Sequence, residues 1–276
     1  MDKRVAVITA LVEGCSVRST SRMTGVSKGA ILRLLAEVGQ ACAEYQYAHL
    51  RNIPARRIQI DEIWSFCYAK QKNVTSQMLE NGHAGDVWTF VAIDAETKLV
   101  PSWFVGRRDA GCAAAFLQDV AARISNRVQL TTDGHKMYLE AVDAAFGGDV
   151  DFAQLVKVYG SDPEAEKRYS PALCLDTTTQ IVIGSPDPAH ISTSYVERQN
   201  LTMRMCMRRF TRLTNAFSKK IENHCHAVAL FYMHYNFCRI HQTLRITPAM
   251  EAGISRHVWS IREIITLSAR TVSLAA

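Results

Sequence analysis

The chain has 276 residues, 48% of them hydrophobic, which is enough for one large domain or two modest ones with a packed core. The formal net charge of +6 is unevenly spread: residues 1–57 carry +5, residues 58–194 carry −7 and residues 195–245 carry +7. Two basic blocks around an acidic middle predict two contacts with a polyanion, flanking a region that can hold cations. The lack of a signal-peptide pattern and of any run of eighteen apolar residues argues against secretion and membrane insertion, so a cytoplasmic, bacterial-type nucleoid-associated protein is expected.

Residues 1–50 have the pattern of a helix-turn-helix DNA-binding domain. Helices are predicted at 3–12, 17–24 and 28–38, and Gly25 provides the turn between the second and the third. Residues 51–57 follow as a basic linker. The alternative is a small helical bundle that does not bind DNA.

The third of these helices opens with Ser27, a favourable N-cap, and would lie in the major groove. Lys28 and Arg33 are then the side chains expected to reach phosphates or base edges. The predicted core of the motif consists of Val17, Met23, Val26, Ile31 and Leu34.

The acidic middle of the chain predicts a mixed α/β domain. Three β-rich runs at 58–66, 87–93 and 99–105 precede a helix that starts at Asp109 or Gly111 and ends near residue 124. A short strand at 128–134 and a helix at 135–146 follow. Three strands, a helix, a strand and a helix is the order of a ribonuclease-H-like mixed-sheet core.

Two aspartates of this core are candidates for a metal site. Asp61 lies on the first strand and Asp133 ends the fourth, and these strands are neighbours at the sheet centre of such a fold, so the carboxylates can converge. Buried carboxylates are costly unless they are paired or bind metal, and two-metal phosphoryl transfer needs such oxygen ligands. Glu62 is expected to face the opposite side of the sheet, and Asp94 is interpreted as a turn residue.

Residues 150–190 are interpreted as an insertion before the last catalytic helix, with β-like stretches at 152–158 and 181–184. The polar loop between them carries Glu164 and Glu166, rival candidates for a third metal ligand. A charged, proline-bearing loop would place a ligand less rigidly than a helix does.

A long helix is predicted to start at Ser194, because Ser194 and Glu197 have the spacing of a capping box and neither proline nor glycine follows before Pro248. Glu197 would lie where the apolar face of this helix meets a basic face that suits phosphate. The arginines expected to follow the DNA backbone are Arg198, Arg204, Arg208, Arg209 and Arg212. A helix-capping glutamate beside a solvated arginine face is the alternative.

Taken together, Gln-Ile-Asp61-Glu-Ile-Trp, Thr-Thr-Asp133-Gly and Tyr-Val-Glu197-Arg-Gln-Asn200 resemble the motifs of the Asp-Asp-Glu (DDE) transposases. The segment 208–219 is most similar to the insertion-sequence-one type, and Tyr235-Asn236 to Pro248-Ala249 resembles the end of many transposase and integrase cores. The resemblance implies that Asp61, Asp133 and Glu197 hold two Mg²⁺ (or Mn²⁺) ions. The long gap between Asp133 and Glu197 and the lack of a paired-cysteine zinc ribbon depart from some relatives.

The resemblance implies a transposase that cuts DNA at the terminal inverted repeats of an insertion sequence and joins the 3′-OH ends to target DNA, working as a homo-oligomer. Asn200, Asn236 and His241 would support the metal site or contact DNA, although core hydrogen bonding is equally open for the last two. The catalytic core would span 58–250 and a C-terminal helical cap 251–276. A ribonuclease-H-like nuclease without joining activity, or an inactive DNA-binding protein, is the alternative.

Overall fold

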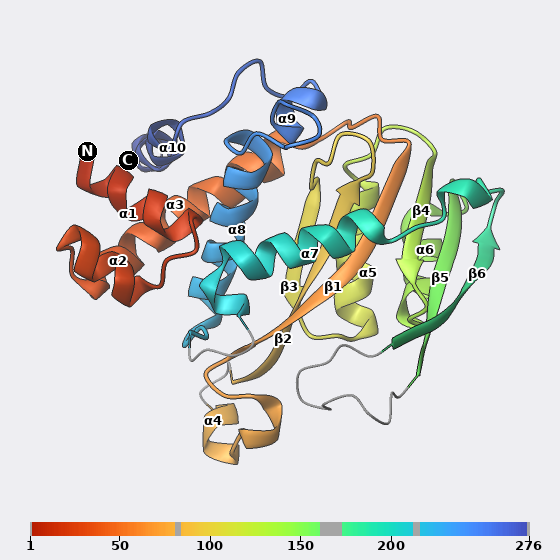
Figure 1. Ribbon diagram of the computed structural model, residues 1–276, viewed down its shortest axis with the longest axis horizontal. Helices are drawn as coiled ribbons and strands as arrows, with labels where there is room; N and C mark the ends of the chain where they lie inside the picture. The colour runs from red at the N-terminus through yellow and green to blue at the C-terminus, as the bar shows by residue number, and fades with distance from the viewer. Residues whose placement is uncertain (1, 81–83, 161–172, 212–215, 275–276) are drawn as a thin grey trace.

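A computed structural model describes residues 2–80, 84–160, 173–211 and 216–274, and the fold is mixed α/β (Figure 1). A six-stranded mixed sheet forms its centre, in the order β3-β2-β1-β4-β5-β6. The strands are β1 (Arg57–Cys67), β2 (Gly85–Asp94), β3 (Ser102–Gly106), β4 (Val128–Asp133), β5 (Val150–Gly160) and β6 (Leu173–Ile183). Strands β1, β4 and β5 run parallel, and β2, β3 and β6 pair antiparallel with their neighbours.

The predicted strand, helix, strand, helix order is confirmed, with small shifts at the ends. Helix α5 (Ala110–Ala121) begins after the N-cap Asp109, whose side chain accepts a hydrogen bond from Cys112 N, and α6 (Met137–Phe146) follows β4. Both helices cover one face of the sheet, while α7 (Ser194–Cys206) crosses the other (Figure 1). Such a six-stranded sheet with helices on both faces is compatible with a ribonuclease-H-like core.

Residues 150–190 contribute two strands to the central sheet, and their role as an insertion before the last catalytic helix stays a prediction. Strand β5 pairs in parallel with β4 over its first residues and then forms a long antiparallel hairpin with β6. The pairing begins earlier in β6 than the short predicted run at 181–184, because three consecutive β-branched residues, Thr177 to Thr179, precede that run. Glu164 and Glu166, the rival metal ligands, lie outside the described residues.

Three N-terminal helices precede the sheet: α1 (Asp2–Val12), α2 (Val17–Thr24) and α3 (Lys28–His49). Ser16 and Ser27 cap α2 and α3 through hydrogen bonds from Ser19 N and Ala30 N, and Gly25 ends α2 in the left-handed conformation. Helix α3 is eleven residues longer than the predicted 28–38, because its second half packs against α8 (Ile221–Phe237). Met23 is 61% exposed, so its predicted place in the small core is wrong.

The contact between α3 and α8 is very close at one glycine. A Cβ atom added to Gly39 would lie 2.6 Å from the Cβ and carbonyl O of His226, so only glycine fits there. One continuous group of buried residues extends from Val7 in α1 through the sheet to Ile265 in α10 (Ile261–Leu274). The N-terminal helices therefore pack directly on the rest of the molecule.

The long helix predicted from Ser194 is much shorter than expected. Thr193, not Ser194, is the N-cap residue, and its side chain donates to Glu197 instead of capping the helix. Helix α7 ends at Cys206, and the chain then turns so that Met207 and Phe210 are both buried, with the Phe210 ring 5.1 Å from that of His224. Tertiary packing, not a glycine or proline, ends this helix.

The described part of the chain also contains shorter elements. They are α4 (Ser76–Glu80), α9 (Pro248–Glu251) and three single turns of 3₁₀ helix at Gln71–Asn73, Pro188–His190 and Arg208–Phe210. Within the described ranges, no helix combines the length and the apolar character needed to cross a bilayer.

Candidate functional site

The two predicted aspartates meet at one end of the central parallel strands. Gln59 of β1 is paired with Thr131 of β4, and Asp61 and Asp133 each lie two residues further along their strands. Because parallel strands in register carry equivalent residues to the same edge, both carboxylates reach the same point of the sheet. The predicted convergence of Asp61 and Asp133 is therefore present in the structure.

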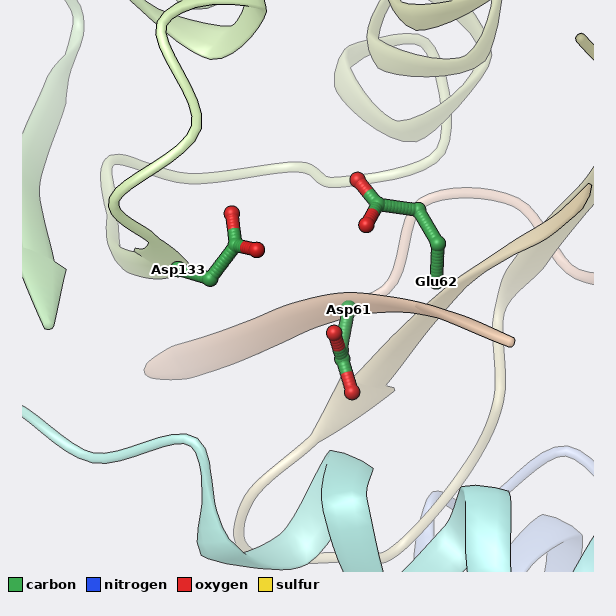
Figure 2. Close-up of side chains that lie close together, drawn as sticks. All are labelled: Asp61, Glu62 and Asp133. Atoms are coloured by element: carbon green, nitrogen blue, oxygen red, sulfur yellow. The ribbon is translucent and has the colours of Figure 1, made fainter. Parts of the chain in front are cut away.

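Glu62 joins these two aspartates, although the strand pattern predicts that it faces the opposite side of the sheet. One carboxylate oxygen from each of Asp61, Glu62 and Asp133 lies within 4.8 Å of the others, a spacing that a shared metal ion can bridge (Figure 2). The two side chains leave opposite faces of β1, as the alternation predicts: Asp61 points towards α7 and Glu62 extends to the other side (Figure 2), where it accepts from Tyr138 of α6. Asp133 ends β4 between the two, so its carboxylate can approach both.

Two groups hold the buried carboxylate of Glu62, whose side chain is 1% exposed. The hydroxyl of Tyr138 on α6 donates to Glu62 Oε1, and Arg108 Nη2 donates to Glu62 Oε2 over 3.1 Å. The same Arg108 nitrogen lies 3.3 Å from Asp133 Oδ2, and its guanidinium stacks over the Trp88 ring. Arg108 is thus a cation fixed between two of the three carboxylates.

Burial and the charge of Asp133 disfavour the ionised forms of Asp61 and Glu62. Burial, followed by the charge of Asp133, raises the pKa of Asp61 to about 6, against the lowering effect of the Glu62 N–H and of Asn200. Burial and the charge of Asp133 likewise raise the pKa of Glu62 to about 7, although Tyr138 and Arg108 lower it. A site in which negative charge is crowded and poorly solvated favours a bound divalent cation.

Helix α7 is attached to the strand that carries Asp61. Gln59 Oε1 accepts hydrogen bonds from Tyr195 N at 2.8 Å and Val196 N at 3.2 Å, at the start of α7. One helical turn later, Asn200 Nδ2 donates to Asp61 Oδ2 at 2.9 Å, while Asn200 Oδ1 is buried without a hydrogen-bond partner in the described part of the chain. Asn200 therefore contacts one of the clustered carboxylates directly, and its role in supporting a metal site stays a prediction.

Glu197, the predicted third metal ligand, is not one of the three clustered carboxylates. It lies in the first turn of α7, accepts from the Thr193 hydroxyl and forms an ion pair with Lys157 of β5. Its charge nevertheless contributes to the raised pKa of Asp61, as the smallest of five causes. Glu197 thus lies on the α7 side of Asp61, opposite the side on which Glu62 lies.

The basic residues predicted to bind DNA differ in their exposure. Four of them are exposed to solvent, namely Lys28, Arg33, Arg198 and Arg208. Two others, Arg204 and Arg209, are partly buried. Arg209 Nη1 donates to Ser218 Oγ at 2.7 Å, so this arginine also has a structural contact. Arg212 lies outside the described residues.

Neither Asn236 nor His241 forms a hydrogen bond with the clustered carboxylates in the described part of the chain, where His241 Nδ1 is buried without a hydrogen-bond partner. Asn236 is fully buried and is bonded to the backbone of Val100, as acceptor from its N–H and donor to its carbonyl, both at 3.0 Å. The neighbouring Tyr235 hydroxyl donates to the carbonyl of Lys98. The Tyr235–Asn236 pair therefore anchors α8 to the segment between β2 and β3, which is the core alternative left open by the sequence.

Comparisons with known proteins give little similarity. No family model matches the chain, and no curated protein matches it. Among solved structures, a chain from the cryo-EM structure of the simian T-cell lymphotropic virus intasome in complex with the PP2A regulatory subunit B56 gamma is similar, with a TM-score of 0.42 and 15% identity over 88% of this chain and 72% of that chain. The functional interpretation therefore rests on the geometry of the site itself.

Proposed function

We propose that this protein is a DDE-type transposase that cuts DNA at the ends of an insertion sequence and joins the freed 3′-OH ends to target DNA. The observation that carries the proposal is the meeting of Asp61 and Asp133 on neighbouring parallel strands, with Asn200 and Glu197 of α7 directed to the same side. The sequence motifs around these residues support the same assignment.

The residues at the site fit divalent metal ions. Three carboxylates lie within 4.8 Å of one another, the pKa values of two are raised by crowding and burial, and the buried Asn200 Oδ1 has no hydrogen-bond partner among the described residues. Asp61 and Asp133 would hold Mg²⁺ or Mn²⁺, with Glu197 or Glu62 as the third carboxylate. When bound, such ions supply charge neutralisation at the phosphate and activation of the attacking oxygen.

The chain's own residues would prepare the site for this reaction. Asn200 orients the carboxylate of Asp61, and Gln59 fixes the start of α7 relative to the strand. Arg108 offsets the charge of Glu62 and Asp133 and so keeps these carboxylates together before the reaction. The exposed cations on α7 and after it would follow the phosphates of DNA.

The N-terminal helices would recognise the terminal inverted repeats. Helices α2 and α3 would form a helix-turn-helix, which the glycine turn between them and the exposed Lys28 and Arg33 at the start of α3 support. Transposition joins two DNA ends, so a homo-oligomer assembled on DNA is part of the proposal.

The proposal is tested by incubating the protein with duplexes taken from the DNA that flanks its reading frame, with Mg²⁺ or Mn²⁺. Wild type should nick these ends and join a pre-cut 3′-OH end to a target plasmid. Asp61→Asn and Asp133→Asn should each lower both activities by at least about a hundredfold, because a metal-binding oxygen charge is lost. Glu140→Gln, an exposed carboxylate on α6, is the matched control and should retain activity.

The third carboxylate is identified by comparing Glu197→Gln with Glu62→Gln in Mn²⁺ titration calorimetry and in the cleavage assay. Glu197→Gln should lose cleavage, whereas loss confined to Glu62→Gln assigns the role to the β1 residue. Cleavage without joining would make the protein a nuclease. If Asp61→Asn cleaves DNA as well as wild type does, the acidic cluster is not catalytic, and the proposal reduces to a DNA-binding protein.

A further inference from the structure

A second site lies apart from the acidic cluster, where the N-terminal helices meet the segment that follows α7. A groove of about 920 Å³ opens between α1, α2, α3, residues 207–209 and 216–219, and α8. None of the clustered carboxylates lines it. We call it the interhelical groove.

The walls of the interhelical groove are largely apolar. Leu35 of α3 and Leu230 and Phe231 of α8 are buried and form its floor, while Leu11 and Phe217 are half-buried along it. The Phe217 ring is held by the ring of Phe66, with the centroids 5.0 Å apart. A fixed aromatic side chain on the wall is a surface on which a flat apolar group can stack.

The charge of the groove has one sign. Among the described residues, no acidic side chain lines the groove. Five cations do, namely Arg18, Lys28, Arg208, Arg209 and Lys219. None of the five forms an ion pair within the described part of the chain.

Arg209 is the most confined of these cations. Burial lowers the pKa of its guanidinium to about 10, and its hydrogen bond goes to Ser218, whose hydroxyl also contacts His224 Nδ1 at 3.0 Å. The His224 ring is itself buried and neutral, with its pKa lowered to about 3 by burial and by Arg209. A confined positive charge without a carboxylate partner favours an anionic ligand.

We propose that the interhelical groove binds an unpaired nucleotide of a DNA strand, with the base against the apolar and aromatic wall and the flanking phosphates on the surrounding cations. This inference rests on the proposed function, in which the protein acts on DNA. Bases in a duplex expose only their edges, so duplex DNA would use the cations and leave the apolar walls without a contact. Unpaired bases offer a π-face as well as a phosphate, which matches both properties of the groove.

The test measures fluorescence anisotropy of a labelled single-stranded oligo-dT of about ten nucleotides, a length within the usual site size. Arg18→Glu and Lys219→Glu should each raise the Kd about tenfold, because a phosphate contact becomes a repulsion. Asn223→Trp leaves the charge unchanged and fills the groove from α8, and should also raise the Kd about tenfold while duplex binding stays within about threefold.

Arg22→Glu is the matched control, since Arg22 is exposed on the same helix as Arg18 but does not line the groove. An equal loss with Arg22→Glu would show that only diffuse charge is at work and would overturn the proposal. Unchanged binding by Asn223→Trp, or displacement of the oligonucleotide by polyglutamate at equal charge, would overturn it too. Each variant is checked for an unchanged urea unfolding midpoint.

Failure of this inference can be told apart from failure of the proposed function. If wild type cuts flanking duplexes but the groove variants bind single strands normally, only the nucleotide site is wrong. If Asp61→Asn leaves cleavage unchanged while the groove variants lose single-strand binding, the groove stands and the catalytic assignment falls.

Discussion

Replacing Asp61 with asparagine should make the metal-free protein more stable at neutral pH while it removes activity. The folded-state pKa of Asp61 is raised from 3.8 to about 6. Ionisation of Asp61 is therefore less favourable in the folded protein than in the unfolded chain. Asp61 accordingly destabilises the folded state increasingly as the pH rises from about 4 to about 6, and the destabilisation is complete above about pH 6. Asparagine cannot ionise, and its Oδ1 can still accept from Asn200 Nδ2.

The pKa difference of about two units corresponds to about 3 kcal/mol, which we reduce to about 1.5 kcal/mol because the side chain is only partly shielded from water. Urea unfolding in EDTA should therefore show Asp61→Asn more stable than wild type by about 1–2 kcal/mol near pH 7.5 and nearly equal to it near pH 4. Added Mn²⁺ should stabilise wild type and not the variant.

Asp151→Asn is the opposite case and serves as the control. Hydrogen bonds from Arg127 and from Ser185 N lower the pKa of Asp151, so its ionised form stabilises the fold and the asparagine variant should be less stable at neutral pH. A pH-independent difference between Asp61→Asn and wild type, or a variant that is less stable at pH 7.5, would refute the reasoning.

Two further changes test the packing that positions the site. Gly39→Ala should lower the free energy of unfolding by about 2 kcal/mol or more, because the added Cβ would meet the backbone of His226. Gly29→Ala, on the exposed face of the same helix, should raise the free energy of unfolding by about 0.5–1 kcal/mol. Equal urea unfolding midpoints for the two variants would contradict this prediction. Asn236→Ala should lower the free energy of unfolding by about 2–4 kcal/mol, since both hydrogen bonds to the Val100 backbone are lost in the core. A loss below about 1 kcal/mol in the same urea assay would contradict this prediction and show that neighbouring side chains fill the space.

Local sequence signals were sufficient for much of the fold. Serine caps and a glycine turn predicted α2 and the start of α3, and the alternation around Asp61 predicted β1 and the face of each side chain. Asp94 is a turn residue as expected, with its carboxylate accepting from Glu96 N and the Thr97 hydroxyl. These features depend on residues close together in sequence.

The features that the sequence did not predict depend on contacts between distant segments. Helix α7 ends at Cys206 among good helix formers, because burial of Phe210 against α8 outweighs their propensity. The participation of Glu62 follows from where β4 stops, since Asp133 lies at the strand end and its carboxylate approaches both faces of β1. Period-2 alternation places Asp61 and Glu62 on opposite faces of one strand, and it cannot show that a carboxylate at the end of the neighbouring strand approaches both of them.

The contact of Gln59 with the start of α7 has a consequence for engineering. Because α7 has no side-chain cap of its own, a glutamine from β1 takes that role and aligns Asn200 with Asp61. Residues 59, 61 and 200 consequently form one transferable unit. A chimera that takes α7 from another protein must also take the matching residue at position 59. Otherwise the start of the helix is not held on β1, and its residue 200 will not lie against the carboxylate of Asp61.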